Sequence, residues 1–324
     1  MVEWHDEVFL EEIHAWIRSA VVVTGPIEQP HVEAWSTVLR APTPDGWVWC
    51  KASAEGSSYE VRLTALLAGL RPHDVPEIIA VDGERGWMLM RDGGVRLRER
   101  GDELEAWRTV LPAYAELQLA TAPHVERLVG IGVPDERLEG LPIRLRALLD
   151  DDQYLMLGEP DGLTIAERER LVAMLPEIGS ICRELAGAGL PATIQHDDLH
   201  GGAVLVRDDR YRVFDWGDAC VSHPFHSLTV LLRATAWKLG LEPGGAELIG
   251  MRDAYLEAFE GFGSRDELVL VAGIAYRTGT LARALAWQRY LSGLPPQERS
   301  EELDTVAYGL QRFLENGPLG AWRW

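Results

Sequence analysis

Two carboxylates on either side of a predicted hairpin are the strongest sign of chemistry in this sequence. Asp198 follows His196 by two positions, and Asp215 comes 17 positions later. Between them, Val204–Val206 and Tyr211–Phe214 are short β-prone runs that flank a polar turn. Because a hairpin brings its two ends together, we expect the two carboxylates to lie close to one another. Such a pair suits a division of labour in which one accepts a proton from a hydroxyl and the other holds a cation.

A metal cluster of a hydrolase is the alternative interpretation of His196, Asp197, Asp198 and His200. Imidazole and carboxylate groups are suitable metal ligands. However, neighbouring positions on one loop rarely converge on a single ion, and the sequence has no second cluster of this kind. The hairpin and its two flanking carboxylates are therefore the better guide to function.

Lys51 is a further candidate because lysine is scarce in this chain. The 324 residues include 31 Lys and Arg against 51 Asp and Glu, and Lys51 and Lys238 are the only lysines. The chain uses arginine almost wherever a cation is enough, yet it keeps a compact ammonium in the apolar segment 47–52. We therefore single out Lys51 as a candidate functional residue. Lys238 precedes Gly240 at a predicted helix end, where a cation favours the helix dipole, and we assign it no function.

The overall composition excludes several classes of protein. A formal charge of −20 argues against sequence-independent binding of nucleic acid, which needs clustered Lys and Arg. No run reaches the roughly 18 apolar residues of a membrane span, and the acidic N-terminal segment lacks the basic start of a signal peptide. Cys50, Cys182 and Cys220 are widely spaced, which favours buried thiols over a disulfide or zinc site. We expect a cytoplasmic protein without a nucleic-acid or membrane partner.

The elements that would position the candidate residues change in kind along the chain. An amphipathic helix is predicted before Ala20, and a second helix has Leu63 and Leu67 on one face. Arg91-Asp92-Gly93-Gly94 is a plausible hinge. The β runs around these helices are Val21–Val23, Trp35–Leu39, Trp47–Cys50, Glu77–Val81 and Trp87–Met90.

Beyond the glycine pair the periodicity is mainly helical. A capping box at Thr164–Glu167 starts a helix that runs toward Ala188. Further helices are expected around 226–239, 266–292 and 299–315. The sequence thus predicts an α+β protein with two lobes. The small β-rich lobe would comprise residues 1–92 with the N-terminal helix, and the larger, mostly helical lobe residues 93–324 with the hairpin.

These motifs, in this order, resemble those of the aminoglycoside phosphotransferase family. The resemblance rests on His196-x-Asp198, the hairpin and Asp215-Trp216-Gly217, behind a β lobe with a strand lysine. Leu199-His200-Gly201 is also typical of the family, and the lobe order extends the likeness over most of the chain. The resemblance implies a bilobal protein-kinase-like fold. It also implies an enzyme that moves the γ-phosphoryl group of ATP or GTP to a hydroxyl of a small molecule, such as an aminoglycoside or amino sugar.

The resemblance implies roles for the residues around the hairpin. Asp198 would orient or deprotonate the acceptor hydroxyl, and His196 would support the loop without reacting. Asp215 would bind a Mg²⁺ ion that bridges the nucleotide phosphates.

The resemblance also implies nucleotide-binding residues in the β-rich lobe. Lys51 would contact the α- and β-phosphates, and Glu60 would hold Lys51 in place. Met90 and Asp92 would complete the nucleotide site. For Glu60 there is an alternative, because Ser57–Glu60 is also a capping box that would use Glu60 to close a helix start.

Two positions depart from the family pattern. Ala203 stands where the family usually has a metal-binding Asn, and a methyl group cannot ligate Mg²⁺. Ser227 replaces an acidic residue that typically supports the catalytic loop, and we expect His223 and Ser227 to provide that support through hydrogen bonds. Water in place of the Asn, reduced or lost activity, and an engineered substitution are all compatible with Ala203. The alternative function is therefore a catalytically impaired, kinase-like nucleotide-binding protein.

The acceptor is the least determined part of the hypothesis. Aminoglycosides, other amino sugars, macrolides, choline-like alcohols and plain sugars all suit such a scaffold. Asp150, Asp151 and Asp152 would attract a cationic acceptor, but three acids in a polar loop are more often only solvated.

Overall fold

The computed structural model describes residues 4–293 and 304–315, and its internal contacts divide the chain into two compact units. The first unit consists of Met1–Gly101, Gly130–Val133 and Gly201–Asp218. The second consists of Asp102–Val129, Pro134–His200 and Ala219–Trp324. The expected lobes 1–92 and 93–324 stay a prediction. The contacts themselves place the hairpin segment with the N-terminal residues.

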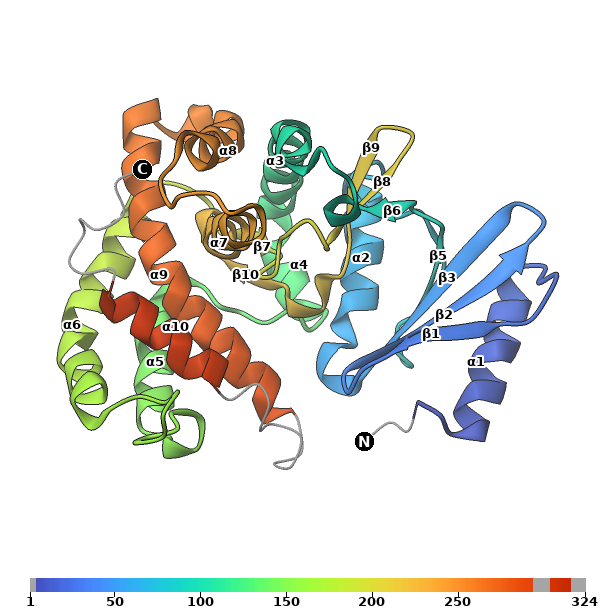
Figure 1. The fold of residues 1–324 in the computed structure, drawn as a ribbon, viewed down its shortest axis with the longest axis horizontal. Coiled ribbons are helices and arrows are strands. Elements are labelled where there is room, and N and C mark those ends of the chain that lie inside the picture. The colour runs from blue at the N-terminus through green and yellow to red at the C-terminus, as the bar shows by residue number, and fades with distance from the viewer. Residues whose placement is uncertain (1–3, 294–303, 316–324) are drawn as a thin grey trace. The chain divides into compact units, whose positions relative to one another are not determined.

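A five-stranded antiparallel sheet is the main element of the first unit (Figure 1), with the strand order β1-β2-β3-β5-β4. Side chains alternate between the two faces of each strand. Cys50 and Leu89 therefore lie on the face with the buried apolar cluster, and Lys51 lies on the other face. The strands are β1 (Glu28–Val32), β2 (Ser36–Thr43), β3 (Gly46–Ser53), β4 (Ile78–Asp82) and β5 (Trp87–Arg91).

Helix α1 (Glu7–Ala20) covers the apolar face of this sheet (Figure 1), as its amphipathic sequence predicts. Asp6 caps the helix by accepting a hydrogen bond from the backbone N–H of Phe9. Ile13 and Ile17 are fully buried in the cluster beneath it, and each such burial is worth about 2 kcal/mol. The helix thus fixes which face of the sheet is closed and which remains for Lys51.

Four of the five predicted β runs in this region are confirmed as strands, and the prediction for Val21–Val23 is wrong. The backbone N–H of Val21 is used at the end of α1, where it binds the carbonyl of Ile17. The next segment is extended but belongs to no strand, and Thr24 reaches β2 only through one hydrogen bond to Pro42. Periodicity alone does not separate such a connection from a short strand.

The rest of the first unit holds helix α2 (Tyr59–Leu70) and a three-stranded sheet. This sheet has the order β6-β8-β9, with β6 (Val95–Arg96), β8 (Val204–Arg207) and β9 (Arg210–Val213), so the predicted hairpin is confirmed. Gly94 has φ +95°, and a Cβ there would lie 2.1 Å from the carbonyl oxygen of Val206. Glycine is therefore required where the chain enters β6.

The second unit is mainly helical, and the helix start predicted at the Thr164–Glu167 capping box is confirmed. Thr164 and Glu167 form the capping box of α6, and Ser264 and Glu267 form that of α9. Residues 299–303 of the last predicted helix lie outside the described residues. The helices are α3 (Glu103–Thr121), α4 (Val125–Gly130), α5 (Leu141–Leu149), α6 (Ile165–Gly187), α7 (Ser227–Leu239), α8 (Ala246–Leu256), α9 (Arg265–Ser292) and α10 (Asp304–Glu315).

Helix α9 and a short strand pair form the interior of this second unit. Among the described residues, α9 is the one helix whose length and composition would allow it to cross a membrane, but 72% of its apolar window is buried inside the unit. Strand β7 (Thr193–Gln195) pairs antiparallel with β10 (Cys220–Ser222), and all six residues are buried. Because β7 ends at Gln195, the His196–His200 loop starts from a rigid, buried support.

Candidate functional site

Three predicted residues meet in the first unit. Lys51 of β3 donates a hydrogen bond from Nζ to Glu60 Oε1 of α2 at 2.8 Å, and a second to Asp215 Oδ1 just after β9. The Lys51 side chain is 12% exposed and that of Glu60 is 1% exposed, whereas that of Asp215 is 57% exposed. One cation therefore joins a buried carboxylate to a surface carboxylate.

The structure decides between the two expectations for Glu60. Its Oε1 binds Lys51, and its Oε2 accepts a hydrogen bond from Ser53 Oγ at 3.0 Å. The residue before α2 is Ser58, whose side chain makes no hydrogen bond that caps the helix. Glu60 is therefore the ion-pair partner of Lys51 and does not close the helix start.

The charges of this cluster support one another. Burial alone would lower the pKa of Lys51, but the carboxylates of Asp215 and Glu60 outweigh it and hold that pKa above its usual value. Burial acts in the opposite direction on Glu60, where it raises the pKa, and the Lys51 ammonium opposes that rise. Lys51 is therefore a fixed positive point charge at neutral pH.

The backbone after the hairpin presents Asp215 in an unusual conformation. Asp215 has φ +67°, in the left-handed region that few residues other than glycine adopt. The preceding Phe214 donates its N–H to the carbonyl of Ala203, and Tyr59 Oη donates to the carbonyl of Gly217. Contacts on both sides thus hold the turn, and such over-determined strain of about 1–3 kcal/mol is common at functional sites.

Met90 and Asp92 occupy different surroundings in the same unit. Met90 is two residues from Met88, the cross-strand neighbour of Lys51, so Met90 lies on the same face of the sheet as Lys51. Asp92 Oδ1 accepts hydrogen bonds from Trp49 Nε1 at 3.3 Å and from the Gly94 N–H at 3.1 Å. Asp92 thus has a structural role at the entry to β6, and a nucleotide contact from either residue stays a prediction.

The second unit holds Asp198 on the loop after β7. Its Oδ1 accepts a hydrogen bond from Arg283 Nη2 at 2.9 Å, and its Oδ2 lies 3.4 Å from His200 Nε2. Burial would raise the pKa of Asp198, but the charge of Arg283 and the hydrogen bond from His200 overcome that effect and lower it well below the usual value. Asp198 is therefore ionised throughout the neutral range and can accept a hydrogen bond from a hydroxyl group.

A buried hydrogen-bond network supports this loop at the position of the missing acidic residue. Ser227 Oγ donates to Gln195 Oε1 at 2.8 Å and also shares a hydrogen bond of 2.8 Å with Tyr114 Oη. The N–H of His196 donates to the same Tyr114 oxygen at 3.1 Å, and His196 is fully buried. Ser227 thus provides the expected support, whereas His223 accepts a hydrogen bond from Phe225 N–H and caps its own turn.

Sequence reasoning did not find Arg283 or Tyr114. Arg283 lies 85 positions after Asp198 on a predicted helix, in a chain that contains 29 arginines. Tyr114 shares an apolar helix face with ordinary core residues. The sequence offered one indirect signal. Ser227 stands where an acidic residue usually supports the loop, so another side chain had to provide that support.

Asp198 and Asp215 belong to different units, so their expected proximity stays a prediction. Elsewhere, three acids considered for a cationic acceptor already have partners. Asp150 pairs with Arg146 and Asp152 with Arg168, while Asp151 accepts a hydrogen bond from the N–H of Gln153. These contacts favour the interpretation of a solvated, structural cluster.

The other candidate sites offer little chemistry. Within residues 4–293 and 304–315, no group of three or more His, Cys, Asp or Glu side chains is arranged to hold a metal ion, so the hydrolase alternative gains no support. Cys50, Cys182 and Cys220 are free and buried, as predicted.

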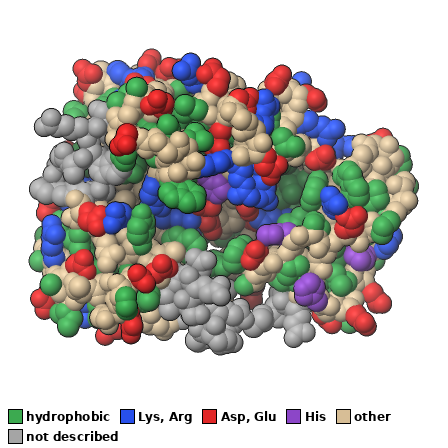
Figure 2. All heavy atoms as spheres, in the orientation of Figure 1, with side chains coloured by type: hydrophobic (Ala, Val, Ile, Leu, Met, Phe, Trp, Pro, Cys, Tyr) green, Lys and Arg blue, Asp and Glu red, His purple; other side chains and the backbone are tan. Residues whose placement is uncertain are grey.

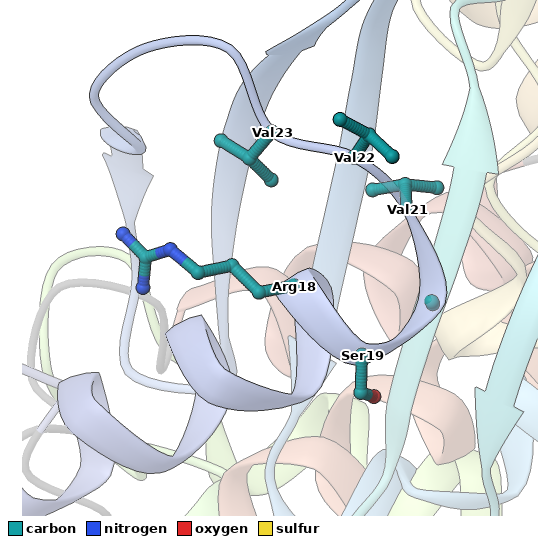
Figure 3. Close-up of a pocket in the computed structure, with 6 residues that line it drawn as sticks. Arg18, Ser19, Val21, Val22 and Val23 are labelled. Carbon is teal, nitrogen blue, oxygen red and sulfur yellow. The ribbon is translucent and has the colours of Figure 1, made fainter.

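A pocket of about 370 Å³ at the end of α1 (Figure 3) is lined by residues 18–23 and contains none of the predicted site residues. Acidic and basic side chains both occur across the face shown in Figure 2.

Comparisons with known proteins agree with the fold and the motifs. A profile of a phosphotransferase enzyme family matches residues 31–268, a range that includes Lys51, Asp198 and Asp215. No curated protein sequence matches the chain.

Solved structures of small-molecule kinases are similar to the chain over nearly their whole length. A choline kinase (LicA) from Streptococcus pneumoniae has a TM-score of 0.60 and 14% identity, over 94% of this chain and 98% of that chain. The amicoumacin kinase hAmiN, in complex with AMP-PNP, Ca²⁺ and Ami, has a TM-score of 0.59 and 11% identity, over 98% of each chain. A macrolide 2′-phosphotransferase type I has a TM-score of 0.56 and 15% identity, over 95% and 97%. The likeness shows a mixed α+β, protein-kinase-like fold.

Replacing Lys51 tests the energetic importance of the cluster. Lys51→Met leaves Glu60 buried without its cation, and we expect the free energy of unfolding at pH 8 to fall by about 3 kcal/mol. Burial raises the pKa of Glu60, and in the variant no ammonium opposes that rise. The variant therefore keeps its stability below the usual glutamate pKa, where Glu60 is protonated, and loses stability as the pH rises through the raised pKa and Glu60 becomes charged. The loss should therefore be smaller at pH 5. Urea unfolding at both pH values measures it.

The double variant Lys51→Met/Glu60→Gln is the control, because it removes the uncompensated charge. It should recover much of the stability at pH 8 and remove the pH dependence. An equal loss at pH 5 and pH 8 in Lys51→Met, with no recovery in the double variant, would show that the ion pair does not stabilise the unit.

Proposed function

Because the chain belongs to the phosphotransferase enzyme family, we propose that it transfers the γ-phosphoryl group of ATP or GTP to a hydroxyl of a small molecule. The observation that carries the proposal is the pair of charge clusters inside the matched segment. One is the lysine held between Glu60 and Asp215, and the other is the ionised Asp198.

Lys51 is suited to bind the α- and β-phosphates of the nucleotide. Its pKa is held high, its position is fixed by Glu60, and the ammonium lies on the sheet face away from the apolar cluster. A compact ammonium is a strong electrostatic partner for phosphate oxygens. When phosphate competes for Lys51, we expect Lys51 to exchange its contact with the more exposed Asp215 and to keep Glu60, which is also bound to Ser53.

The residues after the hairpin fit a Mg²⁺ ion. Mg²⁺ prefers oxygen ligands and is usually bound through one or two carboxylates together with substrate phosphates. Asp215 offers such a carboxylate on the surface, in a turn held by Phe214 and Gly217. When bound, the ion would neutralise charge on the nucleotide phosphates. Ala203 offers only a carbonyl, and that carbonyl already accepts the Phe214 N–H.

Asp198 would act on the acceptor. Arg283 holds its Oδ1 at 2.9 Å, whereas His200 lies at 3.4 Å from its Oδ2, so we assign the acceptor hydroxyl to the more weakly held Oδ2. The hydroxyl oxygen forms the new bond to the γ-phosphorus, the bond from that phosphorus to the bridging oxygen breaks, and the nucleoside diphosphate leaves with that electron pair. The hydroxyl proton passes to Asp198 and then to solvent. Positioning and charge neutralisation supply the rate enhancement, without a covalent enzyme intermediate.

The acceptor is a hydroxyl-bearing small molecule, in line with the choline, macrolide and amicoumacin enzymes of similar fold. The paired state of Asp150 and Asp152 gives no reason to prefer a cationic one. A cytoplasmic location, where nucleotide triphosphates and Mg²⁺ are abundant, suits this function.

A catalytically impaired nucleotide-binding protein is the second candidate, and Ala203 is the observation that favours it. Its methyl group supplies no metal ligand, and the residue is 3% exposed at the start of the hairpin. This candidate shares the nucleotide site with the first one and differs in the absence of turnover.

Two substitutions separate chemistry from binding. Asp198→Asn removes the carboxylate that receives the proton, so transfer should fall by about 10²- to 10⁴-fold while nucleotide affinity is retained. Lys51→Met removes the phosphate contact, so nucleotide affinity should fall by about tenfold or more. Nucleotide binding by calorimetry and product formation by mass spectrometry measure the two effects.

Lys238→Met is the matched control, because Lys238 also pairs with a buried glutamate, Glu103. It also leaves a buried glutamate without its lysine, and we expect its nucleotide affinity to stay within about twofold of that of the unsubstituted protein. Full transfer activity in Asp198→Asn, or equal loss of nucleotide affinity in both lysine variants, would contradict the assigned roles.

Restoring an amide at position 203 tests the second candidate. Ala203→Asn offers an oxygen ligand, so we expect nucleotide affinity in the presence of Mg²⁺ to tighten by about threefold to tenfold, with no change in its absence. Thermal-shift titrations with and without Mg²⁺ measure this. Unchanged or weaker binding in Mg²⁺ would show that position 203 does not face the metal.

A further inference from the structure

Helix α9 places one arginine against both acids of the His196–His200 loop. Arg283 Nη2 donates to Asp198 Oδ1 at 2.9 Å, and Arg283 Nη1 donates to Asp197 Oδ2 at 3.4 Å. The Arg283 side chain is 10% exposed. Arg283 also lies beyond residue 268, where the family profile ends, so the family match assigns it no role.

The guanidinium of Arg283 is held in one orientation. Trp287, one helical turn later, places its ring 5.1 Å from the Arg283 Cζ atom. The planar fork of arginine can bind two carboxylates at once, which the flexible ammonium of lysine does less specifically. Arg283 is thus a rigid link between α9 and the loop.

Asp197 anchors this link from the loop side. It is buried and has φ +63°, a left-handed conformation in which glycine would be unstrained. Gln195 Nε2 donates to its Oδ1 at 3.3 Å, which leaves Oδ2 for Arg283. A cation beside a buried carboxylate offsets the cost of burying its charge, and Arg283 supplies one here.

We propose that Arg283 is the positioning residue for Asp198: one guanidinium binds Asp198 Oδ1 and Asp197 Oδ2, and so fixes the Asp198 carboxylate with its Oδ2 toward the acceptor hydroxyl. This inference rests on the proposed function for its link to transfer. The ion pair itself is a property of the loop and α9. Without Arg283, two adjacent carboxylates repel and Asp198 binds its proton more tightly.

The charged and titratable groups that the structure places near the two acids come from the loop itself and from α3, α9 and β10. His196 and His200 of the same loop and Arg283 of α9 act on Asp198. Tyr114 of α3 and Cys220 of β10 lie near Asp197, and burial holds the pKa of both above their usual values, so neither is charged at neutral pH. Arg283 is therefore the permanent cation of this group.

Arg283→Met and Arg283→Lys test the proposal, with Arg277→Met as the matched control. Arg277 lies on the same helix, is equally buried, and stacks over Phe313 at 4.5 Å, but its nearest carboxylate is Glu177 of α6. The measurements on the full chain are the pH profile of kcat, KM for both substrates, and a ¹³C NMR titration of the Asp198 carboxyl group.

The expected result is specific to Arg283. Arg283→Met should move the acid limb of the kcat profile, and the Asp198 titration, to higher pH by about 1 unit or more, because the raised pKa delays ionisation. It should lower kcat at pH 7 by about tenfold or more, with KM for nucleotide within about twofold. Arg283→Lys should regain part of the kcat and most of the titration, and Arg277→Met should change neither.

Three outcomes would overturn the proposal: an unchanged Asp198 titration in Arg283→Met, a kcat that falls without movement of the acid limb, or an equal effect in Arg277→Met. If Arg283→Met does not fold, Arg283→Lys and Asp197→Asn provide the same titration with less disturbance. If the wild-type chain transfers no phosphoryl group, the proposed function fails, and the NMR titration still decides whether Arg283 controls Asp198.

Discussion

A charge inside a protein must have a partner, and a charge cluster in each of the two units meets this constraint. In the first unit, Lys51 joins the buried Glu60 to the exposed Asp215. In the second, Arg283 joins a buried aspartate of the loop to a partly exposed one. In each case the buried carboxylate holds the cation, and the exposed carboxylate is the one assigned to chemistry. The same arrangement thus fixes a charge and leaves a carboxylate oxygen at the surface.

The sequence was most informative where a residue type was rare or a motif was local. Lys51 stood out because the chain has two lysines, and the structure pairs it with Glu60 as expected. The hairpin was visible from β-prone runs around a polar turn, and the start of α6 was visible from its capping box. Val21–Val23 was assigned wrongly, because a β-branched run beside a helix end has the same pattern as a strand.

Long-range partners were not visible. Arg283 reaches Asp198 across 85 positions, and nothing local distinguishes it from Arg277 on the same helix. Tyr114 supports the loop through Ser227, but its helix face consists of ordinary buried residues. The substitution at position 227 shows how such a network adapts, since a serine hydroxyl and an amide provide the support expected from an acidic side chain.

In the proposed function, these charge clusters serve phosphoryl transfer to a small hydroxyl compound. This role can be tested by incubating the full chain with Mg²⁺, γ-labelled ATP or GTP and each of a panel of hydroxyl compounds. The nucleoside diphosphate and the labelled phosphorylated product are then both quantified. For at least one acceptor, we expect one molecule of phosphorylated product for each molecule of ADP or GDP formed. Consumption of neither nucleotide with any acceptor, or release of labelled inorganic phosphate at a rate that no acceptor changes, would contradict this role.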